Sequence, residues 1–313
     1  MFLSCGDSLY DMFVEPAGSD GLAVSVNGVA GGSPMNVAVG LARLGHSSAY
    51  LTKLSDDIFG QRLRQFLKNN AVDTSLSLDT ERNTTLAFID KQADGSADYS
   101  FYINQTADVS MTSEELPALP DTIKVLHFGS YSTAVGSVSE ALQSLAKRES
   151  GKKVISYDPN LRLAIEPDLD KWRDCFKVFA SCASVIKASD EDIQALVGDD
   201  SEDRFVADCF DLGAQLVYIT RGSAGASAYT KSTTFTEEAA PVKVVDTVGA
   251  GDTFQAAMLH WLAAENHIAD HIANDGQLTG QIDTKASLQF ALKAASITCS
   301  RFGANLPSLD ELA

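Results

Sequence analysis

The sequence predicts an α/β protein with a doubly wound, mainly parallel central sheet. Short apolar runs without polar alternation recur along the chain, which is typical of strands buried on both faces. Amphipathic stretches with apolar residues three and four apart separate these runs, so strand and helix alternate as in doubly wound sheets. The clearest strand candidates are Val125–Phe128, Val154–Tyr157, Ser184–Ile186 and Leu216–Thr220.

The predicted helices carry their own start and stop signals. Pro34–Leu44 opens with proline in its first turn and stops before Gly45, which is the order that helix ends favour. The other candidates share apolar or small residues at helical spacing on one face: Ile58–Asn69, Ser137–Glu149, Ala250–Ala264 and Thr284–Arg301.

Two β-rich segments in the N-terminal third interrupt this alternation. Phe13–Val29 is Gly-rich and strand-like. Thr84–Ile103 contains two β-rich runs, Thr84–Asp90 and Asp98–Tyr102, around the turn signal Asp94-Gly95. We predict a single domain over residues 1–313 with a small discontinuous β-lid, formed by about residues 12–30 and 84–104. An ordinary surface hairpin is the alternative interpretation.

Composition excludes several classes of partner. The 313 residues carry a formal net charge of −18, so the surface repels nucleic acid and anionic lipid, and we expect neither as a partner. The N-terminus lacks the regions of a signal peptide, and no window approaches ~18 consecutive apolar residues. Five cysteines without paired metal spacing favour reduced thiols and a cytoplasmic location.

The stretch Asp246–Thr253 carries the clearest chemical signal. It follows an apolar, β-like run, Pro241–Val245, and opens a predicted helix. Glycines at a helix start expose successive N–H groups, which bind anionic oxygen together with the helix dipole. Asp252 would repel phosphate there, but it suits a base that takes a proton beside a transferring phosphoryl group. Taken alone, it is more often a simple helix cap.

A second group of candidates lies near the N-terminus. In Gly31-Gly32-Ser33-Pro34-Met35-Asn36, the glycines permit a polyol to approach the backbone, and Asn36 offers a donor and an acceptor for hydroxyls. Asp7 and Asp11 flank the end of the first predicted strand, where each carboxylate can accept from vicinal hydroxyls. In isolation these features also fit a turn before a helix and two loop acids.

Together, Gly31-Gly32 with Asn36 and the Asp246–Asp252 stretch resemble the two signatures of the ribokinase-like (PfkB) carbohydrate kinases. The resemblance covers essentially the whole chain, and the 31–38 and 158–162 stretches are most similar to bacterial and plant fructokinases. It implies a three-layer α/β/α sandwich with a small β-lid that makes a homodimer contact. It also implies ATP-dependent phosphorylation of a sugar, D-fructose to fructose 6-phosphate.

The resemblance implies a role for each matching residue. Asp252 is the implied catalytic base, and the backbone of Gly249, Ala250 and Gly251 is the implied anion hole. Arg162 would reach toward the sugar or the transferring phosphate. The other implied contacts are Asp7, Asp11, Gly31, Gly32, Asn36 and Phe101 for the sugar, and Lys187, Thr220, Gly222, Gly225 and Asn305 for ATP.

Two cations are also implied by the resemblance, Mg²⁺ and K⁺. The family's Asn-x-x-Glu, which organises hydrated magnesium, is matched here by Ser189-Asp190-Glu191-Asp192. Serine replaces asparagine, and Asp192 is one methylene shorter than glutamate, so Glu191 is the alternative residue for this role. Asp246 and backbone oxygens near Val248 and Gly303 are the implied ligands of the monovalent cation.

Rival interpretations are weaker or stay open. His267 and His271, with His260 two turns earlier, have a zinc-compatible spacing, but a solvated helix face is favoured. The chain lacks a P-loop and the late glycine of a dinucleotide fingerprint. A non-catalytic sugar- or nucleotide-binding regulator on the same fold remains open. Kinases for 2-keto-3-deoxygluconate or for a nucleoside such as aminoimidazole riboside also remain open.

Overall fold

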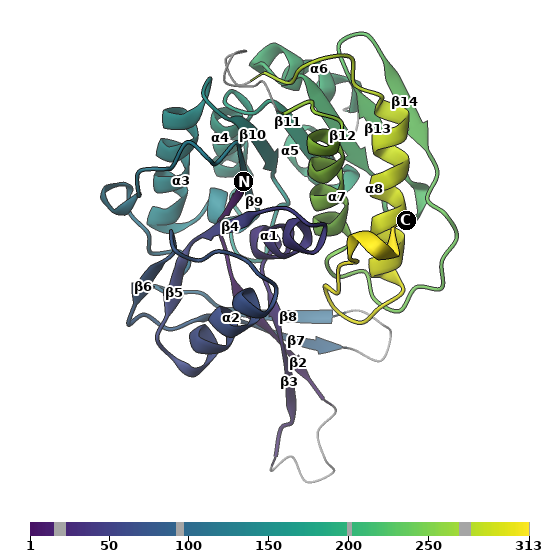
Figure 1. The fold of residues 1–313 in the computed structure, drawn as a ribbon. Coiled ribbons are helices and arrows are strands. Elements are labelled where there is room, and N and C mark those ends of the chain that lie inside the picture. Colours follow the sequence, from purple (N-terminus) through teal and green to yellow (C-terminus); the bar gives the residue numbers. More distant parts are fainter. Residues whose placement is uncertain (16–22, 92–96, 199–201, 269–276, 313) are drawn as a thin grey trace.

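The computed structural model describes residues 1–15, 23–91, 97–198, 202–268 and 277–312. These residues form a large mixed sheet between two layers of helices, with a separate four-stranded sheet projecting from one side (Figure 1). The predicted α/β/α sandwich with a small β-lid is confirmed.

The central sheet has the strand order β14-β13-β12-β11-β10-β9-β1-β4. Six neighbouring strands, from β12 to β4, run parallel, and β13 and β14 add an antiparallel edge. The chain moves from β1 to β4 on one side and later to β9 on the other, which creates a topological switch point. Ligands of open α/β sheets bind beside such a point, at the carboxyl ends of the strands. The strand bounds are β1 (Phe2–Cys5), β4 (Ser48–Leu51), β9 (Val125–Gly129), β10 (Val154–Asp158), β11 (Val185–Ser189), β12 (Leu216–Thr220), β13 (Ala226–Tyr229) and β14 (Thr234–Glu237).

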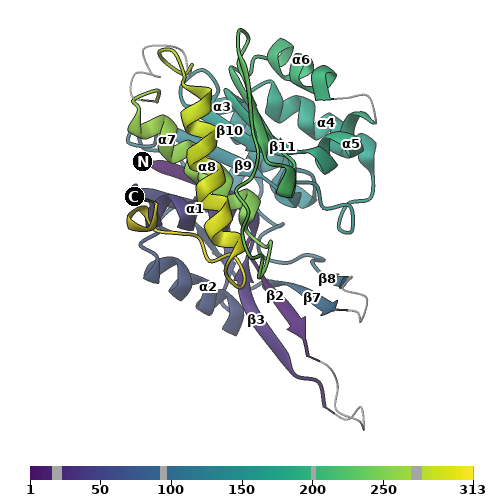
Figure 2. The same ribbon diagram turned by 90° about the vertical axis from the view of Figure 1, so that its right-hand side faces the viewer.

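Helices cover both faces of this sheet (Figure 2). Successive residues of each strand point to opposite faces, so Phe2 packs with one helix layer and Leu3 with the other. One layer contains α1 (Ser33–Arg43), α7 (Ala250–Ala264) and α8 (Thr284–Cys299). The other contains α3 (Gly136–Glu149), α4 (Leu169–Ala180), α5 (Asp190–Val197) and α6 (Glu202–Leu212).

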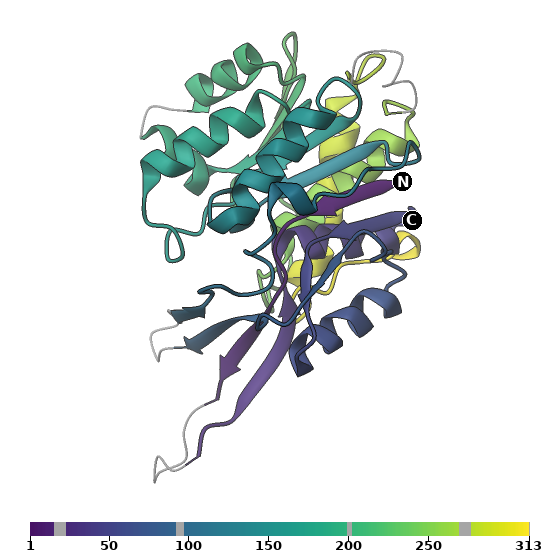
Figure 3. The same cartoon turned by 90° about the vertical axis from the view of Figure 1, so that its left-hand side faces the viewer.

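The lid is a four-stranded sheet of order β3-β2-β7-β8 that extends away from the body (Figure 3). Its strands are β2 (Leu9–Val14), β3 (Val26–Gly31), β7 (Thr85–Lys91) and β8 (Ala97–Tyr102). The predicted turn Asp94-Gly95 lies outside the described residues. Helix α2 (Ile58–Asn69) and the short pair β5 (Lys53–Ser55) and β6 (Leu78–Thr80) lie beside the lid.

Several predicted elements need correction. The run Pro241–Val245 forms no strand, and Val242, Val244 and Val245 are exposed. Its backbone instead bonds to the end of α8, through Val245 N to Cys299 O at 2.8 Å. Helix α8 ends at Cys299 rather than Arg301.

The solvated helix face predicted for the histidines is also wrong. Helix α7 ends at Ala264, and His267 lies beyond it, buried, with Nδ1 2.6 Å from the carbonyl oxygen of Thr279 and its ring stacked on Trp261. His271 lies outside the described residues. Within the part of the chain that the structure describes, no group of three or more His, Cys, Asp or Glu residues is arranged to hold a metal ion.

Two bulk expectations can be compared with the structure. All five cysteines are free, and Cys5, Cys175 and Cys209 are buried, as expected of reduced thiols. Among the described residues, no helix is both long and apolar enough to cross a bilayer.

Candidate active site

A cavity of about 480 Å³ lies where the carboxyl ends of β1, β9 and β11 meet the start of α7 and the inner face of the lid. It therefore occupies the switch point of the sheet. Many residues predicted from distant parts of the sequence line it together: Asp7, Asp11, Gly32, Asn36, Phe101, Arg162, Lys187, Val248, Gly249, Gly251 and Asp252.

Asp252 is fixed at the mouth of α7 by two donors from α1. Ser33 Oγ donates to its Oδ1 at 2.6 Å, and Asn36 Nδ2 donates to its Oδ2 at 2.7 Å. Gly249 precedes the helix in the left-handed region, with φ of 79°, and a Cβ there would lie 2.6 Å from Cβ of Ala304. Glycine is therefore required for this turn, which leaves the first amides of α7 and Asp252 facing one cavity.

Asp7, which follows β1, and Asp11 of β2 form another side of the cavity, called the acidic wall below. Asp7 is buried, accepts a long hydrogen bond of 3.4 Å from the Ser132 amide at Oδ2, and has no partner for Oδ1 within the described structure. Burial, followed by the nearby charge of Asp108, raises the pKa of Asp7 to about 7, while Arg162 opposes the rise. Burial likewise raises the pKa of Asp11 to about 6, again opposed by Arg162. These carboxyls suit neutral hydroxyl ligands better than anions.

The remaining contacts of this wall depend on close backbone approach. Gly32 has φ of 120°, and a Cβ there would lie 2.4 Å from the backbone oxygen of Asp7. Gly31 ends β3, and a Cβ on it would lie 2.4 Å from Oδ2 of Asp11. Both glycines therefore allow α1 and β3 to approach the acidic wall.

A buried ion pair lies under the start of α7. Lys187 Nζ is 2.9 Å from Oδ2 of Asp158, and the side chains are 5% and 1% exposed. A Cβ built on Gly251 would lie 3.2 Å from Lys187 Nζ, so the ammonium group approaches the glycine turn closely. The carboxylates of Asp158, Asp192 and Asp252 raise the pKa of Lys187 despite its burial. The lysine therefore supplies a fixed positive charge beneath the cavity.

Of the residues predicted to bind ATP, only Lys187 lines the central cavity, and the others lie outside it. Thr220 ends β12, and Gly222 and Gly225 form the turn that follows it. None of these residues lines the central cavity, and neither does Ala250, the first residue of α7. Asn305 lies near the end of α1, where its Oδ1 accepts from Arg43 Nη1 at 3.0 Å.

The predicted cation residues are held by backbone amides. Asp192 is buried and accepts from Leu161 N at 2.8 Å and Ser189 N at 3.2 Å, the latter within a capping box. Glu191 is exposed. The structure does bring Asp246, Val248 and Gly303 together, because the Asp246 carboxylate accepts from the amides of Val248 at 3.1 Å and Gly303 at 3.0 Å.

Sequence reasoning missed several residues of the cavity. Ser33 lies within the Gly31–Asn36 stretch, but the sequence gives it no role of its own, and Ser130 and Tyr131 follow β9 without any motif. Ser130, at φ of 61°, and Asn160, at φ of 40°, are non-glycine residues in the left-handed region, and both line the cavity. Such backbone strain clusters at functional sites, but the sequence gives no signal for it.

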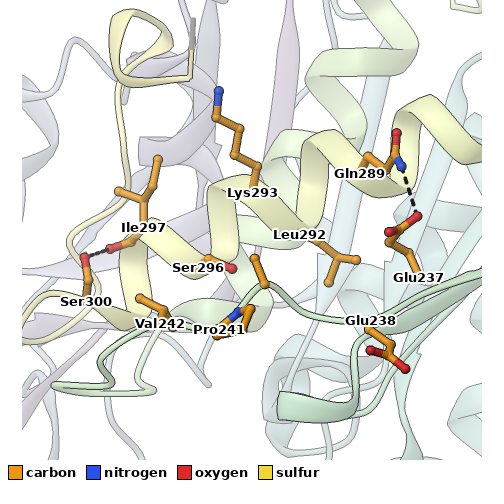
Figure 4. A pocket seen from close by; sticks show the side chains of 11 residues that line it. Glu237, Glu238, Pro241, Val242, Gln289, Leu292, Lys293, Ser296, Ile297 and Ser300 are labelled. Atoms are coloured by element: carbon orange, nitrogen blue, oxygen red, sulfur yellow. Dashed lines mark hydrogen bonds between the residues drawn. The ribbon is translucent and has the colours of Figure 1, made fainter.

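A second, smaller groove of about 360 Å³ lies between the segment after β14 and helix α8 (Figure 4). Ala240, Pro241 and Val242 form one side, and Leu292, Ser296 and Ile297 of α8 form the other. The turn after β12 lies next to this groove, because a Cβ on Gly225 would lie 2.0 Å from the backbone oxygen of Glu237. The groove thus has apolar walls, a glycine turn at one border, and the charged side chains of Glu237, Glu238 and Lys293 among its lining.

Comparison with known proteins identifies the family. Residues 3–311 match the family model described as pfkB family carbohydrate kinase. The chain belongs to the pfkB family of carbohydrate kinases. A curated fructokinase from Rhizobium leguminosarum bv. trifolii is 40% identical to this kinase over 270 residues, covering 85% of the chain and 81% of that protein.

Solved structures share the fold of this pfkB kinase. A fructokinase with bound ATP from Xylella fastidiosa has a TM-score of 0.88 and 26% identity, covering 99% of this chain and 96% of that one. A fructokinase double mutant from Vibrio cholerae O395, in its fructose-, ADP- and potassium-bound form, has a TM-score of 0.82 and 25% identity, with the same coverage. The chain is thus a sugar kinase, an ATP-dependent phosphotransferase.

The buried ion pair generates a stability prediction. We expect Lys187→Met to lower the free energy of unfolding by about 3–5 kcal/mol at pH 7, because it leaves Asp158 buried and unpaired. Already in the native protein, burial raises the pKa of Asp158 to about 6, and Lys187 opposes that rise. Without Lys187 the folded-state pKa rises further, so the loss should shrink as the pH falls toward 5 and the carboxyl binds a proton. Denaturant unfolding at both pH values measures this.

Two controls accompany this measurement. Lys177→Met breaks an exposed pair with Asp174 and should change stability by no more than about 1 kcal/mol. The double variant Asp158→Asn, Lys187→Met should recover most of the loss. A Lys187→Met protein as stable as the double variant at pH 7 would contradict the role of the pair.

Proposed function

We propose that this pfkB kinase transfers the γ-phosphoryl group of ATP to the 6-hydroxyl of D-fructose, with Asp252 as the base. The observation that carries the proposal is the shared cavity, in which the start of α7, Asp252 and the two acidic groups of the opposite wall face one another. Helix amides suit an anionic group, and carboxyls with open acceptor positions suit a polyol. The similarity to fructokinases supports fructose as the substrate.

Asp252 is positioned for the proton transfer. The sugar oxygen would attack phosphorus, the bond from phosphorus to the leaving ADP oxygen would break, and the hydroxyl proton would pass to the Asp252 carboxylate. Ser33 and Asn36 hold both carboxylate oxygens, so the base needs little reorganisation during transfer. Backbone amides at Gly249, Ala250 and Gly251 would stabilise charge on the phosphoryl oxygens, with Lys187 beneath them.

The sugar would bind between the acidic wall and the lid. The unpartnered Oδ1 of Asp7 offers an acceptor to a hydroxyl, and Asp11 offers a second carboxyl. Arg162 lies on the same cavity, and its charge acts on both acids. Phe101 of the lid, stacked on Tyr99, would cover the ring from the other side.

The adenine of ATP would occupy the second groove. The groove is of a size for a heterocyclic base, and the segment between β14 and α7 links it to the glycine turn of the central cavity. Thr220 at the end of β12, with Gly222 and Gly225 in the turn that follows, would contact ribose or phosphate. Asn305 stays a predicted nucleotide contact, although its side chain pairs with Arg43.

Magnesium and potassium would assist through local residues. Asp192 fits magnesium only through water, because both of its oxygens already accept backbone amides. Bound magnesium would neutralise charge on the phosphates of ATP. Asp246 fits a monovalent cation, since its carboxylate is anchored to the Val248 and Gly303 turns, whose peptide units also carry carbonyl oxygens.

Two further expectations belong to this proposal. The lid would form a homodimer contact, which exposed Val26 and Tyr102 on its strands support. Alternative substrates are 2-keto-3-deoxygluconate and a nucleoside such as aminoimidazole riboside, and a non-catalytic regulator is the alternative outside catalysis. The bonded, pocket-facing Asp252 favours catalysis over that last alternative.

A substrate panel tests the function directly. ADP release should be fastest with D-fructose when the protein is given ATP, magnesium and, in turn, fructose, ribose, 2-keto-3-deoxygluconate and several nucleosides. Preferential turnover of another acceptor would replace fructose, and sugar binding without ADP release would favour the regulator. Phosphate at carbon 6 of the product checks the position of transfer.

Replacement of the base tests the mechanism. Asp252→Asn should keep the fold and ATP binding and lower kcat by roughly two to four orders of magnitude, because a positioned general base has that effect. Ser33→Ala serves as a graded comparison, since it removes one of the two donors and leaves the carboxylate in place. An Asp252→Asn enzyme with near-native turnover would exclude Asp252 as the base.

The glycine turn supplies a separate test. Gly251→Val should lower kcat much more than it raises the KM for the sugar, because the added side chain enters the space beside Lys187 Nζ and the helix amides. Steady-state kinetics with varied sugar measure both quantities. A collapse of sugar affinity with kcat preserved at saturation would be the opposite of this expectation.

A further inference from the structure

A buried carboxylate outside the cavity, that of Asp108, connects the lid to Tyr131 of the cavity lining. Asp108 is 1% exposed and lies on the segment that follows β8. Thr85 Oγ1 donates to its Oδ1 at 2.5 Å, and the hydroxyl of Tyr131 donates to its Oδ2 at 2.5 Å. Thr106 Oγ1 completes the cluster, at 3.2 Å from Asp108 Oδ1 and 2.6 Å from Thr85 Oγ1.

The three hydroxyls come from separate parts of the site. Thr85 is the first residue of β7, where the chain enters the second half of the lid, and Thr106 lies where the chain has left β8. Tyr131 belongs to the turn after β9 and lines the central cavity. The Asp108 carboxylate therefore connects the segment that enters β7 and the segment that leaves β8 to Tyr131 of the cavity lining. These two segments are called the lid crossings below.

The segment that carries Asp108 is itself fixed to the body of the protein. Ala107 N bonds to Asn83 O at 2.9 Å, and Ser110 O accepts from Lys53 Nζ at 3.3 Å. Gly136 at the start of α3 packs so closely that a Cβ there would lie 2.5 Å from the backbone oxygen of Val109. Asp108 therefore lies on a segment that is anchored to the body of the protein, and its hydrogen bonds hold the lid strands β7 and β8 relative to that body.

Asp108 also acts on the charge of Asp7. It is the largest of the charged neighbours that raise the pKa of Asp7, after the effect of burial itself. The other groups that face Asp7 are Arg162 and the Ser132 amide, which favour its ionised form, and the Tyr50 hydroxyl, which donates to the Asp7 backbone oxygen at 2.5 Å. One turn contacts both acids, because the Tyr131 hydroxyl donates to Asp108 at 2.5 Å and the next amide, of Ser132, donates to Asp7 at 3.4 Å. Burial raises the pKa of Asp108 as well, and its hydroxyl donors oppose that rise.

We infer that Asp108 is a positioning residue of the sugar site. It holds in place the turn of Tyr131, whose next residue donates to Asp7, and the two segments that join β7 and β8 to the body of the protein. The inference rests on the proposed function, since it assigns the sugar to the Asp7 wall. A side chain that stabilised the fold without electrostatic contact to Asp7 would leave the pH dependence of sugar binding unchanged.

The pH dependence of sugar binding separates these roles. An ionised Asp7 accepts hydroxyls, so the KM for fructose should rise about tenfold per pH unit as the pH falls below the pKa of Asp7. That pKa lies at about 7. Asp108→Asn removes the charge but keeps an acceptor for Thr85 and a donor toward Tyr131. Its inflection should move to lower pH by about one unit, while the KM for ATP stays near its native value.

The control is Asp121→Asn, which removes one charge from an exposed aspartate. Its pH profile should match that of the unaltered protein. The inference is overturned if Asp108→Asn and Asp121→Asn give the same inflection. A ¹³C NMR titration of the Asp7 carboxyl in the ligand-free protein repeats the comparison without turnover. Failure to phosphorylate fructose would therefore refute the proposed substrate, and the titration would still decide the role of Asp108.

Hydrogen exchange tests the mechanical part of the inference. In Asp108→Ala, and to a lesser degree in Thr85→Val, amides of residues 85–90 and 97–106 should exchange about tenfold faster than in Asp121→Asn. Amides of β10 and β11, on the far side of β9, should keep their protection. If Asp108→Ala does not fold, Asp108→Asn and Tyr131→Phe carry the same measurement. If amides of residues 85–90 and 97–106 exchange at an unchanged rate in the folded variants, Asp108 does not hold the lid strands in place.

Discussion

The site depends on the hydrogen bonds that hold the Asp252 carboxylate between Ser33 and Asn36. An aspartate in the first turn of a helix would otherwise be free to accept from the amides of its own helix. The donors from α1 hold it toward the cavity instead. Because α1 starts at the end of β3, the same few residues join the lid, the acidic wall and the start of α7.

Charge is the second constraint on this kinase. A protein of net charge −18 must bind ATP with little help from its surface. Positive charge and oriented dipoles are instead local to the cavity. They come from the start of α7, from Lys187, whose pKa the neighbouring carboxylates raise, and from Arg162. Burial raises the pKa of Asp7 and Asp11, so these two acids place less negative charge on the cavity than exposed acids would.

The lid contributes both cover and geometry. Its inner face places Ile89, Tyr99 and Phe101 on the cavity, and side chains of this kind limit the access of water to it. The strands that enter and leave it pass a fully buried carboxylate that also holds Tyr131. The lid strands and Tyr131 of the cavity are therefore connected through one hydrogen-bonded cluster around Asp108.

Local pattern was sufficient for most of the fold. Ile58–Asn69, Ala250–Ala264 and Leu216–Thr220 have the predicted bounds, because their periodicity and end signals agree with their burial. The run Pro241–Val245 had the composition of a strand, but whether such a run pairs depends on a neighbouring strand, and here it bonds to the end of α8. Local pattern also failed for His267. Helix α7 ends at Ala264, and the chain beyond it places the His267 side chain in the interior.

For the site, the sequence by itself determined the glycine turn, its aspartate and the acidic pair, since each is a local arrangement of residue types with a direct chemical meaning. Only the tertiary structure decided that Ser33 holds the Asp252 carboxylate, that Lys187 pairs with Asp158, and that Asp108 joins three hydroxyls. These contacts link residues as much as 219 positions apart. Their partners are chosen by strand order and helix packing, which leave no mark within a short stretch of sequence.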